Sequence, residues 1–222
     1  MTVKQKNFSV LNKTFSVNPV SPESGLIAKA VYSLKKGGVI VFPTRCLYGL
    51  GADAFNIDAV KKIFAMKQRP FSKPVSILIK SISCLEMVVK NIPDAALLLI
   101  EKLWPGGITI VFEAKKSVPD ILTAGTGKIG VRMPGHPVAA ALLDRFDGPI
   151  TGTSANISHS IGCSNPSKLD SEIAGHIDLI LDAGELESGS GSTVVDITLN
   201  PPLILRHGTV SAKKIFSALK IN

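Results

Sequence analysis

The sequence is poor in cysteine, and its cysteines are scattered. Cys46, Cys84 and Cys163 stand far apart, and no pair has the spacing of a CxxC motif. This argues against a disulfide-stapled scaffold and against a structural zinc site. Free thiols indicate a reducing compartment, so we expect a cytoplasmic protein.

Long apolar runs and aromatic residues are also scarce. No stretch reaches the roughly 18–20 apolar residues that a bilayer span needs, and the N-terminus lacks the apolar segment of a signal peptide. We therefore expect no membrane partner. Aromatic residues make up only 5% of the chain, whereas grooves that bind single-stranded RNA usually interleave aromatic and basic side chains. This argues against a chain that only binds RNA.

Several common site motifs are missing. There is no GxxxxGK[ST] P-loop. Gly125–Gly130 matches GxGxxG, but a strand pattern follows it where a dinucleotide site needs a helix. Ser154 lies in GTSAN and not in GxSxG, and the histidines show no metal-ligand spacing. Nothing in the sequence therefore indicates a covalent nucleophile or a metal held by protein side chains.

What the chain has in excess is positive charge. Lys and Arg total 25 against 17 Asp and Glu, a net charge of +8. Such an excess favours anionic partners, namely nucleotides or nucleic acid. The length of 222 residues with 45% hydrophobic residues is enough for one large domain with a substantial core.

Strand-like and helix-like apolar patterns alternate along the chain. Short β-branched runs predict strands at 39–42, 75–79, 108–112, 129–133, 149–151, 177–181, 193–197 and 203–205. Helical spacing predicts helices at 22–36, 58–67, 83–90, 93–104, 138–146 and 211–219. The interleaving predicts an α/β fold, a single domain with a twisted, mixed parallel and antiparallel sheet flanked by helices.

Two segments lie outside this regular pattern. Residues 1–20 are assigned to an N-terminal tail with an edge strand, and the domain is assigned to residues 21–222. The Gly/Ser-rich stretch 185–192 fits either a mobile lid or an ordinary hairpin loop.

The stretch Gly37–Ile79 carries the strongest local signal. Lys67 lies seven residues after Val60, so it falls on the buried stripe of the predicted helix. A cation on the inward side of a helix end usually meets an anion. Arg69 and Lys73 follow in a loop that two prolines restrict. Two interpretations remain: a preformed anion pocket beside a strand end, or a solvated basic loop.

Further cations close apolar strands. Arg132 lies within IGVRM and Arg206 ends LILR, where a guanidinium group needs a partner. Each arginine alone also fits a structural ion pair. Loops of small residues, whose N–H and hydroxyl groups can approach phosphate oxygens, contain Ser154, Asn156, Ser192 and Thr193. Because ligands bind at strand ends of α/β sheets, we predict a polyphosphate or nucleotide cleft that acts by positioning and charge stabilisation.

Seven collinear blocks resemble the YrdC-like threonylcarbamoyl-AMP synthases. The blocks, which extend from about Ser21 to Ser211, contain FPTRCLYGLGADA, KQRP, LWPGGITIVF, IGVRMPGHP, TGTSANIS, GSTVVDIT and LILRHG. The K-x-R and S-x-N pairs of that family match Lys67 with Arg69 and Ser154 with Asn156. The resemblance implies a YrdC-like catalytic domain over residues 21–222, in the short form without an added C-terminal domain.

The resemblance also implies a reaction. Members of this family make threonylcarbamoyl-AMP and pyrophosphate from L-threonine, bicarbonate or CO2, and ATP. Mg²⁺ would be held mainly through the phosphates. A separate threonylcarbamoyl transferase complex would then pass the group to an adenosine of tRNA, which makes tRNA a further candidate partner.

By matching position, the resemblance implies two groups of site residues. The ATP-binding group would contain Lys67, Arg69, Lys73, Ser154, Asn156 and Arg206, with Lys67 and Arg69 as the catalytic pair. The group that holds threonine or its carbamate would contain Thr44, Cys46, Arg132, Ser192 and Thr193. No residue is assigned to a metal.

A few positions depart from the family pattern. Arg45 and Cys46 replace an acid followed by Thr, Ser or Ala, Leu78 stands where many members have His, and Gly191 where many have Glu. These changes concern the amino-acid end more than the nucleotide end. Two alternatives stay open: a non-catalytic RNA-binding module of the same fold, and a carbamoyl-transfer activity like that of the similar domain in hydrogenase-maturation proteins.

Overall fold

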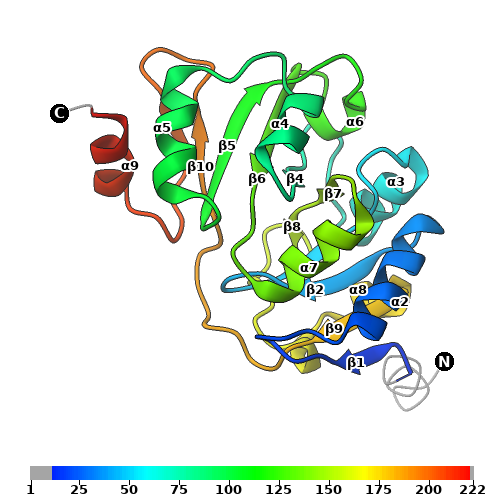
Figure 1. Ribbon diagram of the computed structural model, residues 1–222. Coiled ribbons are helices and arrows are strands. Elements are labelled where there is room, and N and C mark those ends of the chain that lie inside the picture. Colours follow the sequence, from blue (N-terminus) through cyan, green and yellow to red (C-terminus); the bar gives the residue numbers. More distant parts are fainter. Residues whose placement is uncertain (1–11, 221–222) are drawn as a thin grey trace.

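The structure, a computed structural model that describes residues 12–220, contains two β-sheets with helices packed against them (Figure 1). Both sheets mix parallel and antiparallel strands, so the predicted α/β class with mixed strands flanked by helices is confirmed. The strands divide into two sheets, however, instead of forming one. The expected tail at residues 1–11 lies outside the described residues.

The first sheet has the strand order β1-β9-β2-β3-β8. Its strands are β1 (Thr14–Ser16), β2 (Ile40–Pro43), β3 (Tyr48–Gly51), β8 (Thr153–Ser154) and β9 (Leu179–Asp182). Helices cover both faces, because β2 is apolar on both sides: Phe42 packs toward one pair of helices and Val41 toward the other. The first pair is α2 (Ser24–Lys35) and α7 (Pro137–Phe146), and the second is α3 (Ile57–Met66) and α8 (Ser171–His176). β1 is an edge strand, parallel to β9.

Strand β3 corrects the sequence-based prediction, which treats residues 43–54 as a loop. β2 and β3 form an antiparallel hairpin in which Phe42 pairs with Gly49. Tyr48 is fully buried, while a Cβ atom on Gly51 would lie 2.8 Å from Cε1 of Phe42. The Phe42 ring therefore occupies the space that a side chain at Gly51 would need. The two glycines hide the strand pattern, because glycine has a low strand propensity.

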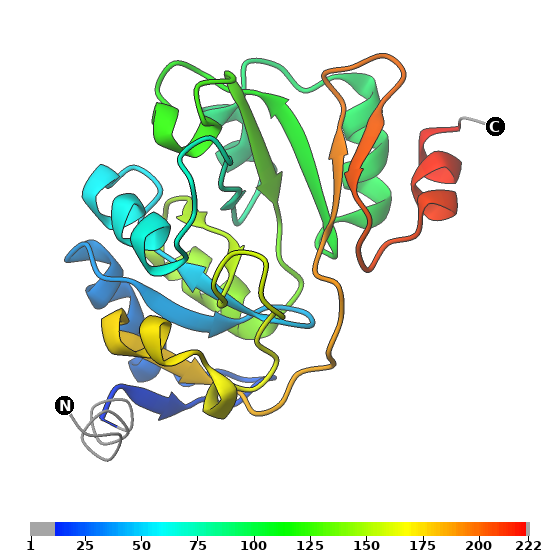
Figure 2. The ribbon, with the colours of Figure 1, turned by 180° about the vertical axis from the view of Figure 1, so that it is seen from behind.

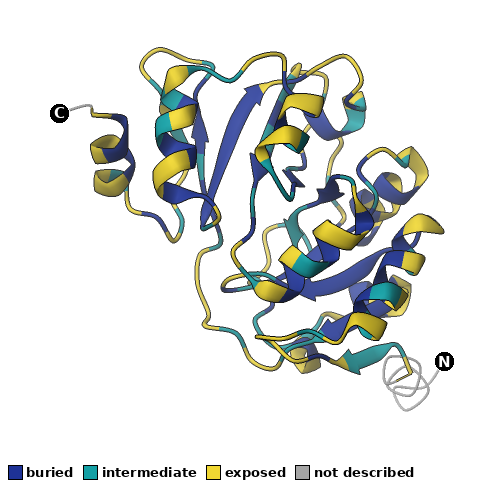
Figure 3. Ribbon diagram, viewed as in Figure 1, coloured by how far each residue is buried: buried dark blue, intermediate teal, exposed yellow. Residues whose placement is uncertain are grey.

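The second sheet has the order β11-β10-β5-β6-β4-β7. Its strands are β4 (Ile77–Leu78), β5 (Ile108–Glu113), β6 (Lys128–Arg132), β7 (Ile150–Thr151), β10 (Thr193–Asp196) and β11 (Leu203–Arg206). One face packs against α4 (Ile82–Val88), α5 (Asp94–Leu103), α6 (Asp120–Thr123) and α9 (Ala212–Leu219). Figure 3 shows that most strands are buried, whereas β1 is more exposed, and that exposed residues lie on the outer sides of the helices.

Alternation along each strand of the second sheet separates core from cavity. In β6, Ile129 and Val131 enter the core, whereas Lys128, Gly130 and Arg132 face the opposite side. That opposite face looks toward the first sheet and lines a cavity. The strand period therefore decides which side chains can meet a ligand.

The chain crosses between the sheets three times, through residues 52–76, at Gly152 and through residues 183–192. Gly152 separates β7 from β8; its N–H donates to the Ser76 carbonyl oxygen at 2.7 Å, and Ser76 Oγ donates to its carbonyl oxygen at 2.8 Å. Residues 183–192 link β9 of the first sheet to β10 of the second, along one side of the molecule (Figure 2). The hairpin-loop interpretation of residues 185–192 is therefore wrong, and the lid interpretation stays a prediction.

The remaining predicted helices and strands are present with shifted ends. The short elements α6, α8 and β8 and a 3-10 turn at Pro166–Lys168 are not predicted from the sequence, because two to six residues are too few to show a period. Within residues 12–220, no helix has the length and apolar character needed to cross a membrane.

The contact between Gly51 and Phe42 generates a stability prediction. Gly51→Ala should lower the free energy of unfolding by about 1–3 kcal/mol, because overpacking displaces a buried ring. Gly25→Ala is the matched control, since Gly25 lies in α2 with nothing within 4 Å of its Cβ position; it should stabilise by about 0.5 kcal/mol. Urea unfolding measures both. Equal midpoints for Gly51→Ala and the wild type would contradict the packing described here.

Candidate active site

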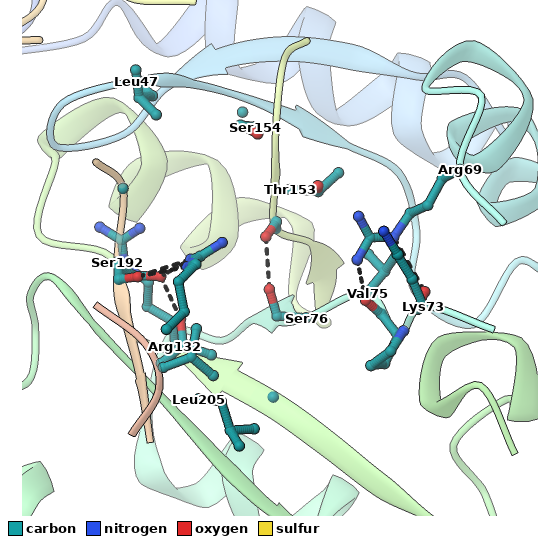
Figure 4. A pocket seen from close by; sticks show the side chains of 18 of the residues that line it. Leu47, Arg69, Lys73, Val75, Ser76, Arg132, Thr153, Ser154, Ser192 and Leu205 are labelled. Carbon is teal, nitrogen blue, oxygen red and sulfur yellow. Dashed lines mark hydrogen bonds between the residues drawn. The ribbon is translucent and has the colours of Figure 1, made fainter. Parts of the chain in front are cut away.

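A cavity of about 810 Å³ opens between the two sheets and collects most of the predicted site residues. Nine of the eleven line it: Thr44, Lys67, Arg69, Lys73, Arg132, Ser154, Asn156, Ser192 and Arg206. Cys46 and Thr193 are not among its lining residues. Figure 4 shows Arg69 and Lys73 on one side of the cavity and Arg132 and Ser192 on the opposite side. We call these the α3 end (Lys67, Arg69, Lys73) and the β6 end (Arg132, Ser192, Arg206).

Lys67 is the most deeply buried cation of the site. It caps the C-terminus of α3, and only 2% of the residue is exposed. Its Nζ donates to the main-chain carbonyl oxygens of Ser154 at 2.5 Å and Asn156 at 2.6 Å. Burial, followed by the nearby charge of Arg69, lowers the pKa of Lys67 to about 7. The helical period therefore predicts the inward direction of Lys67 correctly, but two carbonyl groups hold it instead of a protein carboxylate.

Ser154 and Asn156 line the cavity, and they also contribute to the α3 end through their main chain. Their main-chain carbonyl groups hold Lys67. The Nδ2 of Asn156 donates to the carbonyl oxygens of Ile157 and Ser160, at 2.7 Å each. Its Oδ1 is buried without a hydrogen-bond partner. Hydrogen bonds within residues 156–160 therefore stabilise this loop, and the carbonyl oxygens of Ser154 and Asn156 accept hydrogen bonds from Lys67.

The loop after α3 fixes the second cation of the α3 end. The Arg69 guanidinium group donates through Nε to the carbonyl oxygen of Lys73 at 3.1 Å and through one terminal nitrogen to that of Pro74 at 2.7 Å. Burial lowers the pKa of Arg69, and the charge of Arg206 adds to this shift. Arg69 is thus held by carbonyl groups near other cations, so the preformed-pocket interpretation of this loop agrees with the structure better than a solvated basic loop.

The β6 end is built around two arginines. Arg132 Nε donates to the carbonyl oxygen of Gly106 at 2.7 Å, and Arg206 donates to the carbonyl oxygen of Ser192 at 2.8 and 3.1 Å and to its hydroxyl at 3.0 Å. Thr109 Oγ1 lies 2.8 Å from the same hydroxyl. Neither arginine forms an ion pair within the described residues.

Burial also sets the electrostatics of the β6 end. It lowers the pKa of Arg132 to about 10; the nearby Cys46 opposes this shift, while the charges of Arg206 and Arg45 add to it. Burial likewise lowers the pKa of Arg206. Several cations therefore share this end without a carboxylate to offset them, and each is destabilised until an anion binds.

Two sequence-based assignments need correction. Along β10, Ser192, Val194 and Asp196 line the cavity, so Thr193 points to the core. Its hydroxyl donates to the carbonyl oxygen of Val210 at 2.6 Å and accepts from the N–H of Val210 at 3.1 Å, so this hydroxyl is directed away from the cavity. Cys46 is only 8% exposed and packs against the 185–192 segment. A Cβ atom added at Gly189 would lie 3.3 Å from the Sγ of Cys46.

The sequence analysis missed an ion pair in the cavity wall. Lys128 Nζ lies 2.9 Å from Oδ2 of Asp196, whose Oδ1 accepts from the N–H and hydroxyl of Thr198. A signal existed, because Lys128 lies four residues before Arg132 in one strand and must share its face. The pair joins β6 to β10 across β5, which lies between them in the sheet.

The charge balance of the cavity decides what it can bind. Among the residues that the structure describes, the lining contains six cations, namely Lys67, Arg69, Lys73, Lys128, Arg132 and Arg206, and a single acid, Asp196, which is already paired. The volume fits the range of small-molecule sites. The geometry therefore suits a polyanion of nucleotide size, held at two ends and stabilised by fixed positive charge.

Comparison with known proteins shows which family this chain resembles. The family model Sua5_yciO_yrdC, described as telomere recombination, matches residues 32–208. A Pyrococcus abyssi relative named threonylcarbamoyl-AMP synthase is 38% identical over 182 residues, which cover 82% of this chain and 54% of that protein. A Mycobacterium tuberculosis relative is 37% identical over 96% of this chain and 97% of its own length.

A solved structure from the same family has a similar fold. Pyrococcus abyssi Sua5 complexed with L-threonine superposes with a TM-score of 0.87 at 36% identity, over 92% of this chain and 60% of that one. The chain thus spans little more than half the length of the archaeal protein and nearly all of the mycobacterial one. Since the family model covers most of the chain and includes every cation at the two ends of the cavity, the chain belongs to the Sua5/YciO/YrdC family.

Proposed function

We propose that this chain makes threonylcarbamoyl-AMP and pyrophosphate from L-threonine, bicarbonate and ATP. The observation that carries the proposal is the charge balance of the cavity, where six cations face one paired acid. ATP and the carboxylate groups of threonine and its carbamate are anions that such a cavity attracts. The name of the Pyrococcus abyssi relative and the bound L-threonine in the Pyrococcus abyssi structure support the same reaction.

The α3 end is assigned to the phosphates of ATP. Lys67, Arg69 and Lys73 supply the charge there, and the charge of Arg206 at the β6 end also acts on Arg69. Ser154 and Asn156 contribute by fixing Lys67 through their carbonyl groups. Because Lys67 is already oriented by two hydrogen bonds, its remaining N–H can meet a phosphate oxygen without reorganisation.

The β6 end is assigned to threonine and its carbamate. Arg132 offers the terminal nitrogens of its guanidinium group to a carboxylate, since only its Nε donates to the protein. Ser192 and Thr44 supply hydroxyl groups in the same wall. Cys46 lies near enough to oppose the lowering of the pKa of Arg132, and Thr193 supports the start of β10 through its hydrogen bond to Val210.

The reaction then needs positioning and charge more than covalent help from the protein. The amine nitrogen of threonine bonds to the carbon of CO2 and loses a proton, which gives the carbamate. A carbamate oxygen attacks the α-phosphorus of ATP, the bond from that phosphorus to the bridging oxygen breaks, and pyrophosphate leaves. The cations offset the charge that develops on the transferring and leaving phosphates.

Magnesium is treated as part of the ATP substrate. Within the described residues no group of His, Cys, Asp or Glu side chains could hold a metal ion, and the one acid in the cavity wall is occupied by Lys128 and Thr198. The protein residues therefore do not fit a metal site of their own, and no step above uses one.

A separate transferase would carry the threonylcarbamoyl group to an adenosine of tRNA.

The direct test is whether pyrophosphate release depends on each of the proposed substrates. ATP should release pyrophosphate only when L-threonine and bicarbonate are both present, because the carbamate is the nucleophile. An enzyme-coupled pyrophosphate assay with each component omitted in turn measures this. Tight, salt-sensitive binding of RNA without any such release would favour the RNA-binding alternative instead.

The lowered pKa of Lys67 predicts a pH dependence of ATP binding. In the free protein Lys67 is charged below about pH 7 and neutral above it, so ATP binding must supply the free energy of protonation at higher pH. We compare the Kd for ATP of Lys67→Met with that of the wild type. The ratio of variant to wild type should fall several-fold between pH 7 and 8.5, by up to about tenfold per pH unit, because only the wild type must protonate Lys67. Using the ratio cancels the titration of ATP itself. A ratio that stays constant over this range would refute the assignment.

The two ends of the cavity should separate in steady-state kinetics. Arg132→Met should raise the KM for threonine about tenfold or more, because a charge-assisted hydrogen bond is lost, and should leave the KM for ATP nearly unchanged. Arg69→Met should do the reverse. Thermal unfolding of both variants controls for folding. If each variant raised both KM values equally, the two ends of the cavity would not bind different substrates.

A further inference from the structure

A histidine at the α3 end has no role in the mechanism above. His159 lines the cavity, and its Nε2 lies 2.9 Å from Nζ of Lys73. A lysine ammonium group has three N–H donors and no acceptor. Nε2 must therefore accept, which places the ring proton on Nδ1. The pair connects the loop after α3 with the loop after β8, two segments 86 residues apart in sequence.

The backbone of His159 is in a conformation that side chains rarely adopt. Its φ angle is +73°, in the left-handed region that favours glycine. The surrounding loop holds it there, since Asn156 Nδ2 brackets the residue through the carbonyl oxygens of Ile157 and Ser160. The N–H of Ser158 also donates to the Lys67 carbonyl oxygen at 2.9 Å. A glycine would fit this position without strain, so the presence of histidine needs another reason.

Stability does not provide that reason. Lys73 and His159 form an exposed contact, and exposed polar contacts add little to the free energy of folding. The cavity does provide a reason. The one acid that lines it, Asp196, is paired with Lys128, so no carboxylate in the described wall orients Lys73. The neutral imidazole does this without cancelling the positive charge of the ammonium group.

We propose that His159 is a positioning residue of this chain, which holds the Lys73 ammonium group at the phosphate end through Nε2 and so strengthens binding of the pyrophosphate part of ATP. The inference rests on the proposed function, because it assumes that the α3 end receives phosphates. It assigns to this chain a residue that acts through Lys73 and touches no reacting atom.

The test measures binding of inorganic pyrophosphate by calorimetry. Glycine and asparagine both tolerate a φ of +73°, but only asparagine offers an oxygen to Lys73. His159→Gly should therefore weaken pyrophosphate binding about 5–10-fold without loss of thermal stability, and His159→Asn should stay within about twofold of the wild type. Lys220→Gly is the control, since Lys220 has a φ of +57° at the end of α9 and does not line the cavity; its pyrophosphate affinity should match the wild type.

A double-mutant cycle separates positioning from a local structural effect. If His159 acts through Lys73, His159→Gly should weaken binding no further once Lys73→Met is present. The inference is overturned if His159→Gly binds pyrophosphate as tightly as the wild type, if His159→Asn is as weak as His159→Gly, or if the two substitutions are additive. A wild-type chain that binds no pyrophosphate would instead count against the proposed function.

Discussion

The site depends on a buried ammonium group that has no carboxylate partner. Lys67 caps the C-terminus of α3, and its Nζ donates to the carbonyl oxygens of Ser154, the last residue of β8, and of Asn156 in the loop that follows. Carbonyl groups satisfy its hydrogen bonds but leave its charge uncompensated. The contact joins α3 to β8, both of which belong to the first sheet and its covering helices, so it fixes one end of the cavity. Below about pH 7 it also keeps a positive charge there for a ligand.

The same arrangement recurs around the cavity and explains its electrostatics. Arg69, Arg132 and Arg206 are also held by carbonyl or hydroxyl oxygens, and burial lowers the pKa of each. These cations repel one another and are partly desolvated, a cost that the proposed polyphosphate and carboxylate ligands would relieve. Lys128 differs, because Asp196 already offsets its charge. Binding and stabilisation of developing negative charge thus draw on one preorganised set of groups.

The elements that sequence patterns predicted well are those with several apolar contacts along their length. The period of α3 indicated the inward direction of Lys67, and the β-branched runs located most strands. β3 was missed because Gly49 and Gly51 make room for the Phe42 ring, a requirement that comes from packing across the hairpin. The loop at the end of β8 was expected to approach phosphates through N–H and hydroxyl groups. The structure adds that the carbonyl groups of Ser154 and Asn156 hold Lys67, and no residue type signals the direction of a carbonyl group.

The sequence alone determined the α/β class, the family resemblance, the excess of cations and the residues that carry them, because these follow from residue type and spacing. Tertiary structure decided the division into two sheets and the facing of each strand, which turned Thr193 to the core and Lys128 to the cavity. It also decided that His159 meets Lys73 across 86 residues of chain. Such contacts depend on how separate loops are brought together by the packed sheets, and no local pattern contains that information.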